Sequence, residues 1–302
     1  MSKWIRNYRL TWIKKGEDPI VVQYPITIEF SVRRENLSQG GEGNFLIMNL
    51  GKETRQKMQK HFNDPPGDAV VKLEAGYGNN LSVIFNGTVR WANSHRPEGS
   101  VNFVTQINGF DYGTVPNNSN DQFTVTGKDA SQASVIRRLC GCLKIVDENL
   151  NYVPIPIGAI GTFDETEQTK YSLCGSAWEE LKKVSGRRCY IDNGRVYVLN
   201  DNDVLEGAEI VVSSDSGLLG TPKIDQNQLI IETIFEPAVR VGGTIKIKSQ
   251  ALEDQNGTYK IISIQHSGTI SGAVSGKCKT KIVMMVGRQG VDNPFAYIKE
   301  TR

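Results

Sequence analysis

The sequence predicts a mainly β chain with a smaller α+β part in its middle, divided into residues 1–113, 114–203 and 204–302. Apolar and polar residues alternate with the period of two that half-buried strands require, first near the start of the chain and again beyond Val204. Between these stretches, turn-forming residues and two short helical patterns replace the alternation. We call the three parts the N-terminal, middle and C-terminal regions.

Short alternating segments follow one another through the N-terminal region. In residues 26–34 (ITIEFSVRR), the side chains of Ile26, Ile28, Phe30 and Val32 are expected to lie on one face of the predicted strand. The same alternation is present in residues 7–15, 70–78, 81–94 and 100–112. Residues 51–68 instead predict a short helix, which must end at Asp-Pro-Pro-Gly because proline cannot continue a helix.

The middle region predicts two short helices and a hairpin. Each helical pattern follows a candidate N-cap, which is Asp129 or Ser131 in the first and Ser172 or Ser176 in the second. Gly186 is expected to end the second helix. In residues 187–200, Asp-Asn-Gly stands between two β-rich arms, which predicts a tight hairpin.

Strand patterns return in the C-terminal region, in residues 208–214, 228–249, 257–272 and 278–287. Within the second of these, Pro237 cannot donate to a sheet and makes Glu236 extended, so Glu-Pro predicts a corner between two strands. Gly242 and Gly243 permit positive φ where the chain enters the next strand.

Composition narrows the function classes. The 302 residues carry a formal net charge of +2. The overall electrostatic field of the protein is therefore too weak to hold nucleic acid or an anionic membrane. No apolar run is long enough to span a bilayer and the start lacks a signal-peptide pattern, so we expect cytoplasmic synthesis and no stable membrane association. The five cysteines are odd in number and absent from the first 139 residues, which favours reduced thiols over disulfides.

The residues that could be catalytic or metal-binding are each better explained by a structural role. His266 has no second His or Cys at ligand spacing, which favours a structural or interface role. Cys140 and Cys142 are spaced as Cys-x-Cys without a partner pair. Glu179 and Glu180 point about 100° apart on a helix, which favours a solvated face. We therefore expect no enzyme and no catalytic, cofactor-binding or metal-binding residue.

Three parts of the sequence resemble, in order, the baseplate hub proteins of contractile-tailed bacteriophages. In the C-terminal region the resemblance rests on Pro237, Arg240, Gly242, Asn256, Gly257, Tyr259 and His266. In the N-terminal region it rests on Gly76, Tyr77, Phe85, Gly87 and Val89. Residues 177–200 resemble the helix, glycine and hairpin unit that lies between the two tube-like domains of that family.

The resemblance implies a fold and an assembly. It implies two tube-like antiparallel β-barrel domains, residues 1–113 and 204–302, that superpose on each other and flank an α+β domain of residues 114–203. It further implies a homotrimer in the virion baseplate, between a tail tube protein and a central spike protein, near tape measure and other baseplate proteins. Three copies with two tube-like domains each match a sixfold ring. DNA is expected to pass through the lumen without specific binding.

Two alternating, glycine-bounded segments are candidates for contact between subunits. Their candidate interface residues are Leu81, Phe85, Val89, Trp91, Arg240, Ile245, Ile247 and Lys248. If Ile245 faces a neighbour, its replacement by Asp is expected to stop ring formation. If it faces the chain's own core, the same change is expected to cause misfolding.

Two alternative functions remain open from the sequence. A hub-associated cell-wall hydrolase would need a catalytic middle region, but residues 114–203 are few for such a domain and contain no histidine. A glycan-binding tail or receptor-binding protein would need clustered exposed aromatics, whereas the four tryptophans are scattered.

Overall fold

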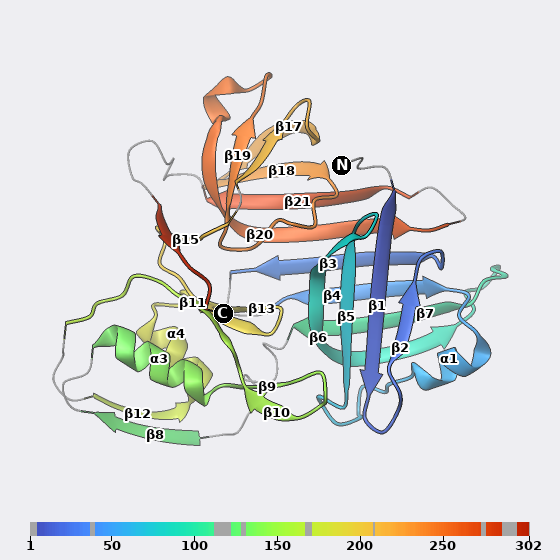
Figure 1. Cartoon of the computed structure of the whole chain (residues 1–302), viewed down its shortest axis with the longest axis horizontal. Helices are drawn as coiled ribbons and strands as arrows, with labels where there is room; N and C mark the ends of the chain where they lie inside the picture. Colours follow the sequence, from blue (N-terminus) through green and yellow to red (C-terminus); the bar gives the residue numbers. More distant parts are fainter. Residues whose placement is uncertain are drawn as a thin grey trace.

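The computed structural model describes residues 5–36, 40–111, 122–127, 131–166, 171–207, 209–272, 276–285 and 295–301. The chain is mainly β, as the sequence predicts, and its largest element is one curled sheet of 13 strands (Figure 1). None of the helices in these residues is long and apolar enough to cross a membrane.

The N-terminal region forms seven strands and one short helix in the described residues. The strands are β1 (Arg6–Lys14), β2 (Ile20–Gln23), β3 (Ile28–Glu35), β4 (Glu42–Met48), β5 (Ala69–Tyr77), β6 (Asn80–His95) and β7 (Val104–Asp111). The helix α1 (Lys52–Lys57) interrupts them, as the sequence predicts. It ends before Met58, whose side chain is fully buried.

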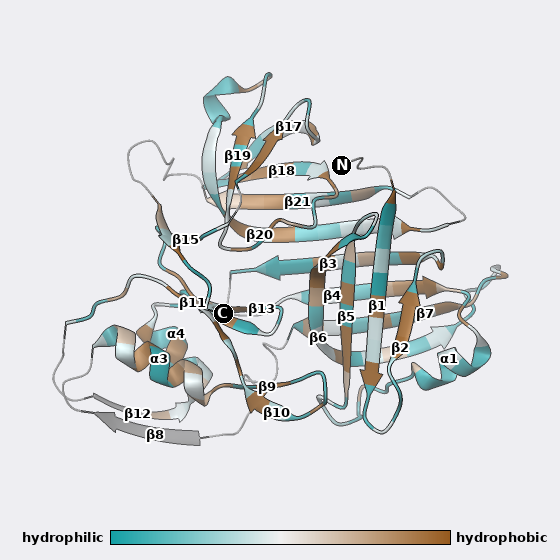
Figure 2. Cartoon of the chain, in the orientation of Figure 1, coloured by the Kyte–Doolittle hydropathy of each residue, from teal (hydrophilic) through white to brown (hydrophobic). Residues whose placement is uncertain are grey.

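The middle region has two helices against small sheets. Its elements are β8 (Gln122–Gly127), α3 (Gln132–Cys142), β9 (Lys144–Val146), β10 (Tyr152–Pro154), β11 (Ile157–Ile160), β12 (Tyr171–Ser176), α4 (Ala177–Val184), β13 (Cys189–Asp192) and β14 (Arg195–Val198). Figure 2 shows brown and teal residues interleaved along α3, which is typical of a helix with one face in a core.

The predicted local signals of the middle region are confirmed. Ser131 is the N-cap of α3, where its side-chain oxygen accepts from the backbone N–H of Ser134 at 3.2 Å, and the alternative Asp129 lies outside the described residues. Ser176 occupies the N-cap position of α4, although its side chain makes no capping hydrogen bond, and Gly186 follows that helix with a φ of 63°. The turn between β13 and β14 has positive φ at Asn193 and Gly194, which is the type I′ geometry of a tight hairpin.

The C-terminal region returns to strands. It contains β15 (Asp203–Leu205), β16 (Ile210–Ser213), β17 (Leu218–Asp225), β18 (Gln228–Ile234), β19 (Thr244–Lys248), the short 3-10 helix η1 (Glu253–Gln255), β20 (Gly257–Ile270), β21 (Cys278–Met285) and β22 (Ala296–Ile298). The predicted corner lies between β18 and β19. Gly242 has a φ of 79° there, whereas Gly243 has no positive φ, so only one of the two glycines meets that expectation.

One pairing joins the two β-rich regions. The main path of the sheet is β17-β18-β21-β20-β3-β4-β7-β6-β5-β1-β2, and β19 adds to β20 and β16 to β19. Antiparallel β3 and β20 pair from Ile28↔Ile270 to Glu35↔Ser263, so strands more than 220 residues apart in sequence are hydrogen-bonded. The main path of the sheet is open, with β2 and β17 at its two ends, and β16 ends the branch that leaves β20 through β19. A division into two barrel domains around a middle domain stays a prediction.

Three hydrophobic clusters correspond to the three regions, and each cluster also contains residues of another region. The first packs under the N-terminal strands and includes Phe235 and Ile270. The second packs under the C-terminal strands and includes Tyr190 and Tyr197 of the hairpin β13–β14. The third holds α3 and α4 and includes Val70 of β5. The regions are therefore joined through shared cores as well as through the sheet.

Candidate functional site at the junction of the three regions

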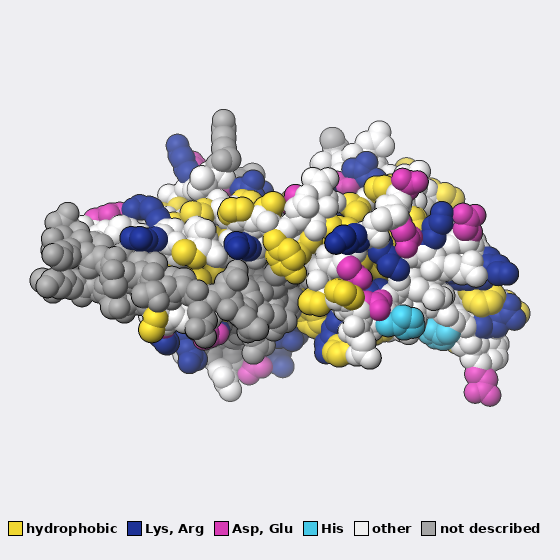
Figure 3. All heavy atoms as spheres, turned by 90° about the horizontal axis from the view of Figure 1, so that it is seen from below, with side chains coloured by type: hydrophobic (Ala, Val, Ile, Leu, Met, Phe, Trp, Pro, Cys, Tyr) yellow, Lys and Arg dark blue, Asp and Glu magenta, His cyan; other side chains and the backbone are white. Residues whose placement is uncertain are grey.

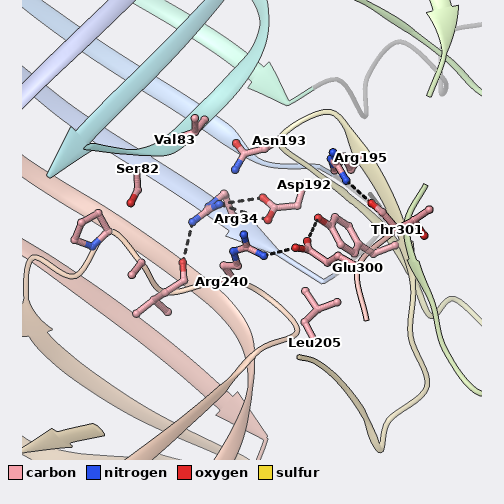
Figure 4. A pocket seen from close by; sticks show the side chains of 14 residues that line it. Arg34, Ser82, Val83, Asp192, Asn193, Arg195, Leu205, Arg240, Glu300 and Thr301 are labelled. Atoms are coloured by element: carbon pink, nitrogen blue, oxygen red, sulfur yellow. Dashed lines mark hydrogen bonds and ion pairs between the residues drawn. The ribbon is translucent and has the colours of Figure 1, made fainter. Parts of the chain in front are cut away.

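A polar cavity of about 550 Å³ lies where the three regions meet (Figure 4). It is lined by Arg34, Ser82 and Val83 of the N-terminal region, Asp192, Asn193, Arg195 and Tyr197 of the middle region, and Leu205, Arg240, Glu300 and Thr301 of the C-terminal region. Because each region contributes charged or polar groups, this junction is a candidate binding site.

Arg34 ties all three regions together. It lies on β3 in phase with Phe30 and Val32, so the strand directs its side chain toward the interior. Its Nη1 donates to both carboxylate oxygens of Asp192, at 3.2 and 3.4 Å, and its Nη2 donates to the backbone carbonyl of Val239 at 3.2 Å. Arg34 and Asp192 are both almost fully buried, so each charge depends on the other to offset the cost of its lost hydration.

His266 completes the buried network from β20. Its Nε2 accepts from Arg34 Nη2 at 3.4 Å, and in the neutral tautomer its Nδ1–H donates to Thr280 Oγ1 at 2.9 Å. Burial, followed by the nearby Arg34 charge, lowers the pKa of His266 well below its ordinary value. The imidazole is therefore neutral near pH 7 and enclosed by the protein. This confirms a structural role for His266.

The hairpin β13–β14 is fixed to the end of β7. The Asp111 carboxylate accepts from the backbone N–H groups of Asn193 and Gly194, at 2.9 and 3.3 Å. Gly242 lies on the other side of this hairpin, where an added Cβ would stand 2.4 Å from the Tyr190 hydroxyl oxygen. The hairpin thus depends on glycine at 242 for close contact with the C-terminal region.

A second set of interacting polar and charged residues lines the cavity, and it includes Glu300 and Thr301 near the end of the described chain. Glu300 accepts from Arg240 at 2.6 Å and from the Tyr197 hydroxyl at 2.8 Å, and Arg195 donates to the Thr301 carbonyl at 2.9 Å. Burial raises the pKa of Glu300, but the hydrogen bonds from Arg240 and Tyr197 outweigh it and hold that pKa below its ordinary value. Burial raises the pKa of Tyr197, so the phenol stays protonated as a donor.

The paired charges of this junction join the three regions to one another. Its main charged side chains are bound to one another, with Arg34 on Asp192 and Arg240 on Glu300. Among the described residues, no group of three His, Cys, Asp or Glu side chains could hold a metal ion. The buried thiols are poor nucleophiles, because burial raises the pKa of Cys140 to about 12 and that of Cys189 to about 11.

The eight residues predicted to contact a neighbouring subunit fall into two groups. Phe85, Val89, Ile245 and Ile247 are buried in the chain's own cores, because the apolar face of each alternating strand packs inward. Their side chains therefore do not reach the surface. Arg240 and Lys248 are exposed, and Leu81 and Trp91 are partly exposed, so of the eight predicted residues only these four have side chains that can contact a neighbouring subunit.

Sequence reasoning missed Arg34, Asp192, Asp111 and Glu300. One signal was present for Arg34, because this charge continues the apolar stripe of Ile28, Phe30 and Val32 at the next inward position. A charge in phase with a core stripe indicates a buried partner. Nothing comparable in the sequence indicates that this partner is Asp192, 158 residues further along the chain.

A titration experiment tests the role of His266. Its folded-state pKa lies below the unfolded value of about 6.5, so the unfolded chain binds the proton first as the pH falls. The stability difference between wild type and His266→Gln is expected to be constant above about pH 7 and to shrink as the pH falls below 6.5. Urea unfolding of both proteins from pH 8 to pH 5 measures this difference. A difference that does not change with pH would show that His266 titrates as it does in the unfolded chain.

Two of the solved structures that are similar to this chain are tail proteins. The tail protein from Neisseria meningitidis MC58 matches with a TM-score of 0.60 and 11% identity, covering 96% of this chain and 99% of that chain. The 43 kDa tail protein of prophage MuSo2 from Shewanella oneidensis matches with a TM-score of 0.58 and 8% identity, covering 95% and 99%. The fold is thus that of a bacteriophage tail protein.

A third similar structure is the E. coli c3393 protein, a component of the type VI secretion system described as similar to the T4 bacteriophage tail proteins gp27 and gp5. It matches with a TM-score of 0.54 and 9% identity, covering 94% of this chain and 80% of that chain. The family model "Baseplate hub gp41" matches residues 10–269, so the chain belongs to the baseplate hub gp41 family. This confirms the resemblance. No curated protein matches the chain in sequence.

Proposed function

We propose that the chain is the trimeric hub of a contractile-tail baseplate, which joins a sixfold tail tube to a threefold central spike and encloses part of the DNA conduit. The observation that carries the proposal is the curled, open sheet of 13 strands, to which both β-rich regions contribute. Three such chains supply six β-rich regions around one axis, which reconciles the two symmetries.

The two ends of the sheet support association between copies. The end strands β2 and β17 leave main-chain groups unpaired and carry exposed apolar side chains, Val21 on β2 and Leu219 and Ile224 on β17. Open edges of this kind favour pairing with another chain unless they are covered. In a ring, each copy covers the edges of its neighbours, and the exposed Arg240 and Lys248 are candidates for the surrounding contacts.

One face of the sheet suits a DNA conduit. A row of small uncharged polar residues crosses four adjacent strands in register: Ser267 on β20, Ser31 on β3, Asn44 on β4 and Asn108 on β7. Asn108 donates to Asn44 at 2.8 Å, so these side chains bind one another. The row continues to Lys279 on β21, and Arg33 lies on the same face as Ser31, but these two cations are paired with Glu232 and Glu35. Cations that are already paired hold phosphates weakly, which allows DNA to pass.

Assembly tests this proposal directly. The full chain is expected to form a trimer, alone or when mixed with the tail tube and spike proteins of the same phage, and the complex is expected to contain three hub copies. Mass photometry measures the copy number and electron microscopy the symmetry. A chain that remains monomeric with both partners, yet releases muropeptides from peptidoglycan or binds glycans, would replace this function with one of the two alternatives.

A further inference from the structure

The described chain ends in a short segment that crosses from the C-terminal region to the middle region. We call residues 296–301 the strap. It begins as β22, which pairs in parallel with β15, and these two strands form a sheet of their own. It ends beside the middle region, where the backbone N–H of Thr301 donates to the carbonyl of Gly158 at 2.7 Å. The strap therefore bridges the two regions at the cavity described above.

Three side-chain donors hold the strap in place (Figure 4). The two oxygens of the Glu300 carboxylate have different partners, since Oε2 accepts from Arg240 and Oε1 accepts from the Tyr197 hydroxyl. The third donor, Arg195, binds the carbonyl of Thr301, the next residue along the strap. Separate donors for both carboxylate oxygens and for the following carbonyl recognise an acidic residue together with its backbone.

The strap is less buried than the strand on which it lies. None of the described residues 295–301 is buried, whereas all three residues of β15 are buried. Ile298 contacts the second hydrophobic cluster and is itself only partly buried, and Tyr297 is 59% exposed. A segment with few buried apolar contacts opens at a lower free energy than the core of the same protein. Local release of the strap is therefore expected to need less free energy than global unfolding.

Two hollows adjoin the ion pair between Arg240 and Glu300. The cavity of about 550 Å³ and a second hollow of about 340 Å³ are both lined by Leu205, Ala238 and this ion pair, and the second hollow extends to β16 and β19. Binding sites are typically concave and largely preformed, with a few polar groups that fix the orientation of the ligand. The strap leaves space on this surface, so the site has room for a segment with larger side chains than its own.

We propose that Arg195, Tyr197 and Arg240 form a peptide-binding site, which the strap occupies in the free chain, and that a partner protein enters it with an extended segment that displaces the strap. The edge of β15 pairs with the backbone of the incoming segment, and the three donors select its acidic side chain, as in recognition by strand addition. The site lies within one chain, so this inference goes beyond the proposed trimer and does not depend on it.

The strap indicates the chemistry of the partner. In Ile298-Lys299-Glu300, the aliphatic residue that contacts the second cluster is followed two positions later by the carboxylate. Residues two apart in an extended segment point to the same side. The partner is therefore an extended segment with an aliphatic residue and a carboxylate at this spacing. The face seen in Figure 3 gives no comparable indication, since dark blue, magenta and yellow side chains are interspersed over its described part.

A synthetic peptide with the sequence of residues 295–302 (FAYIKETR) is the probe, and fluorescence anisotropy measures its binding to the full-length chain. In Glu300→Arg, Arg240 repels the strap, so the site is open in a larger fraction of molecules and the peptide is expected to bind about 10-fold more tightly than to wild type. Because this peptide is cationic, the added positive charge alone would weaken its binding. Glu300→Arg/Arg240→Glu is the matched control: it restores opposite charges within the chain, removes the arginine that the peptide needs, and should bind no better than wild type.

A second peptide, FAYIEKTR, exchanges the lysine and the glutamate and keeps the net charge. Its carboxylate points to the opposite side of the extended segment, so it is expected to bind Glu300→Arg about 10-fold more weakly than the first peptide does. Circular dichroism checks that each variant is folded. If Glu300→Arg misfolds, Glu300→Gln is the milder variant, and its expected gain over wild type is about 3-fold.

The two peptides and the variants decide the inference together. Tighter binding of the first peptide by Glu300→Arg or Glu300→Gln, with weaker binding of the exchanged peptide, would support the site. Equal binding of the two peptides would overturn it, and so would the lack of any gain over wild type in a folded variant. The copy number in mass photometry is a separate measurement, so a chain that binds the peptide but never forms a trimer would contradict only the proposed function.

Discussion

Ile245→Asp is expected to unfold the C-terminal region. The Ile245 side chain is fully buried in the second hydrophobic cluster, on a strand held between Ile210 of β16 and Tyr259 of β20. A carboxylate there has no cation to pair with in that cluster and loses its hydration. We expect a loss of more than about 4 kcal/mol, a large part of the roughly 5–15 kcal/mol that stabilises a typical domain.

Two variants on the same strand calibrate this prediction. Lys248→Asp changes an exposed position and is expected to alter the free energy of unfolding by no more than about 0.5 kcal/mol. Ile245→Val removes one methylene and is expected to cost about 0.5–1.5 kcal/mol. Urea unfolding followed by circular dichroism measures all three. If Ile245→Asp folds with wild-type stability and fails only to assemble, the side chain faces a neighbouring subunit and its burial in the core is disproved.

Arg34→Met is expected to be the second most damaging substitution. It leaves the Asp192 carboxylate in a buried junction without the cation that it contacts at 3.2 Å. Breaking a buried ion pair from one side costs about 3–5 kcal/mol, because the remaining charge is uncompensated. The loss should extend beyond β3, since Arg34 also donates to the Val239 carbonyl and so connects all three regions.

A double-mutant cycle separates this effect from simple loss of packing. Asp192→Leu alone leaves Arg34 unpaired and is also expected to destabilise the chain, but Arg34→Met with Asp192→Leu removes both charges. The double variant is therefore expected to be more stable than the sum of the two single losses predicts, by at least about 1 kcal/mol. Denaturant unfolding of the four proteins gives the coupling energy. Strictly additive losses would mean that the two side chains do not stabilise each other.

Local elements of this protein could be predicted because their causes are local. The alternation in residues 26–34 specifies a strand whatever it pairs with, and Asp-Asn-Gly specifies the hairpin because its turn needs positive φ at two residues. Ser131 caps α3 through a hydrogen bond from the backbone N–H of Ser134, which is only three residues away in sequence. In each case the controlling interaction lies within a few residues, so a short segment contains the information.

The candidate site was less predictable, because its groups come from distant parts of the chain. Arg34, Asp192 and His266 lie on β3, β13 and β20, and each is unremarkable within its own segment apart from the inward phase of Arg34. Their meeting depends on the β3–β20 pairing and on the docking of the hairpin by Asp111. No short-range pattern encodes such contacts.

The sequence by itself determined the mainly β character, the helices and the hairpin. It also determined the resemblance to baseplate hub proteins, which rests on the order of three weak sequence motifs. Only the tertiary structure decided which face of each strand is inside. Alternation shows that Ile245 and Ile247 share a face, but it does not distinguish the chain's own core from a neighbour's surface, because both remove apolar area from water. The fold places that face in the core and leaves Arg240 and Lys248 outside.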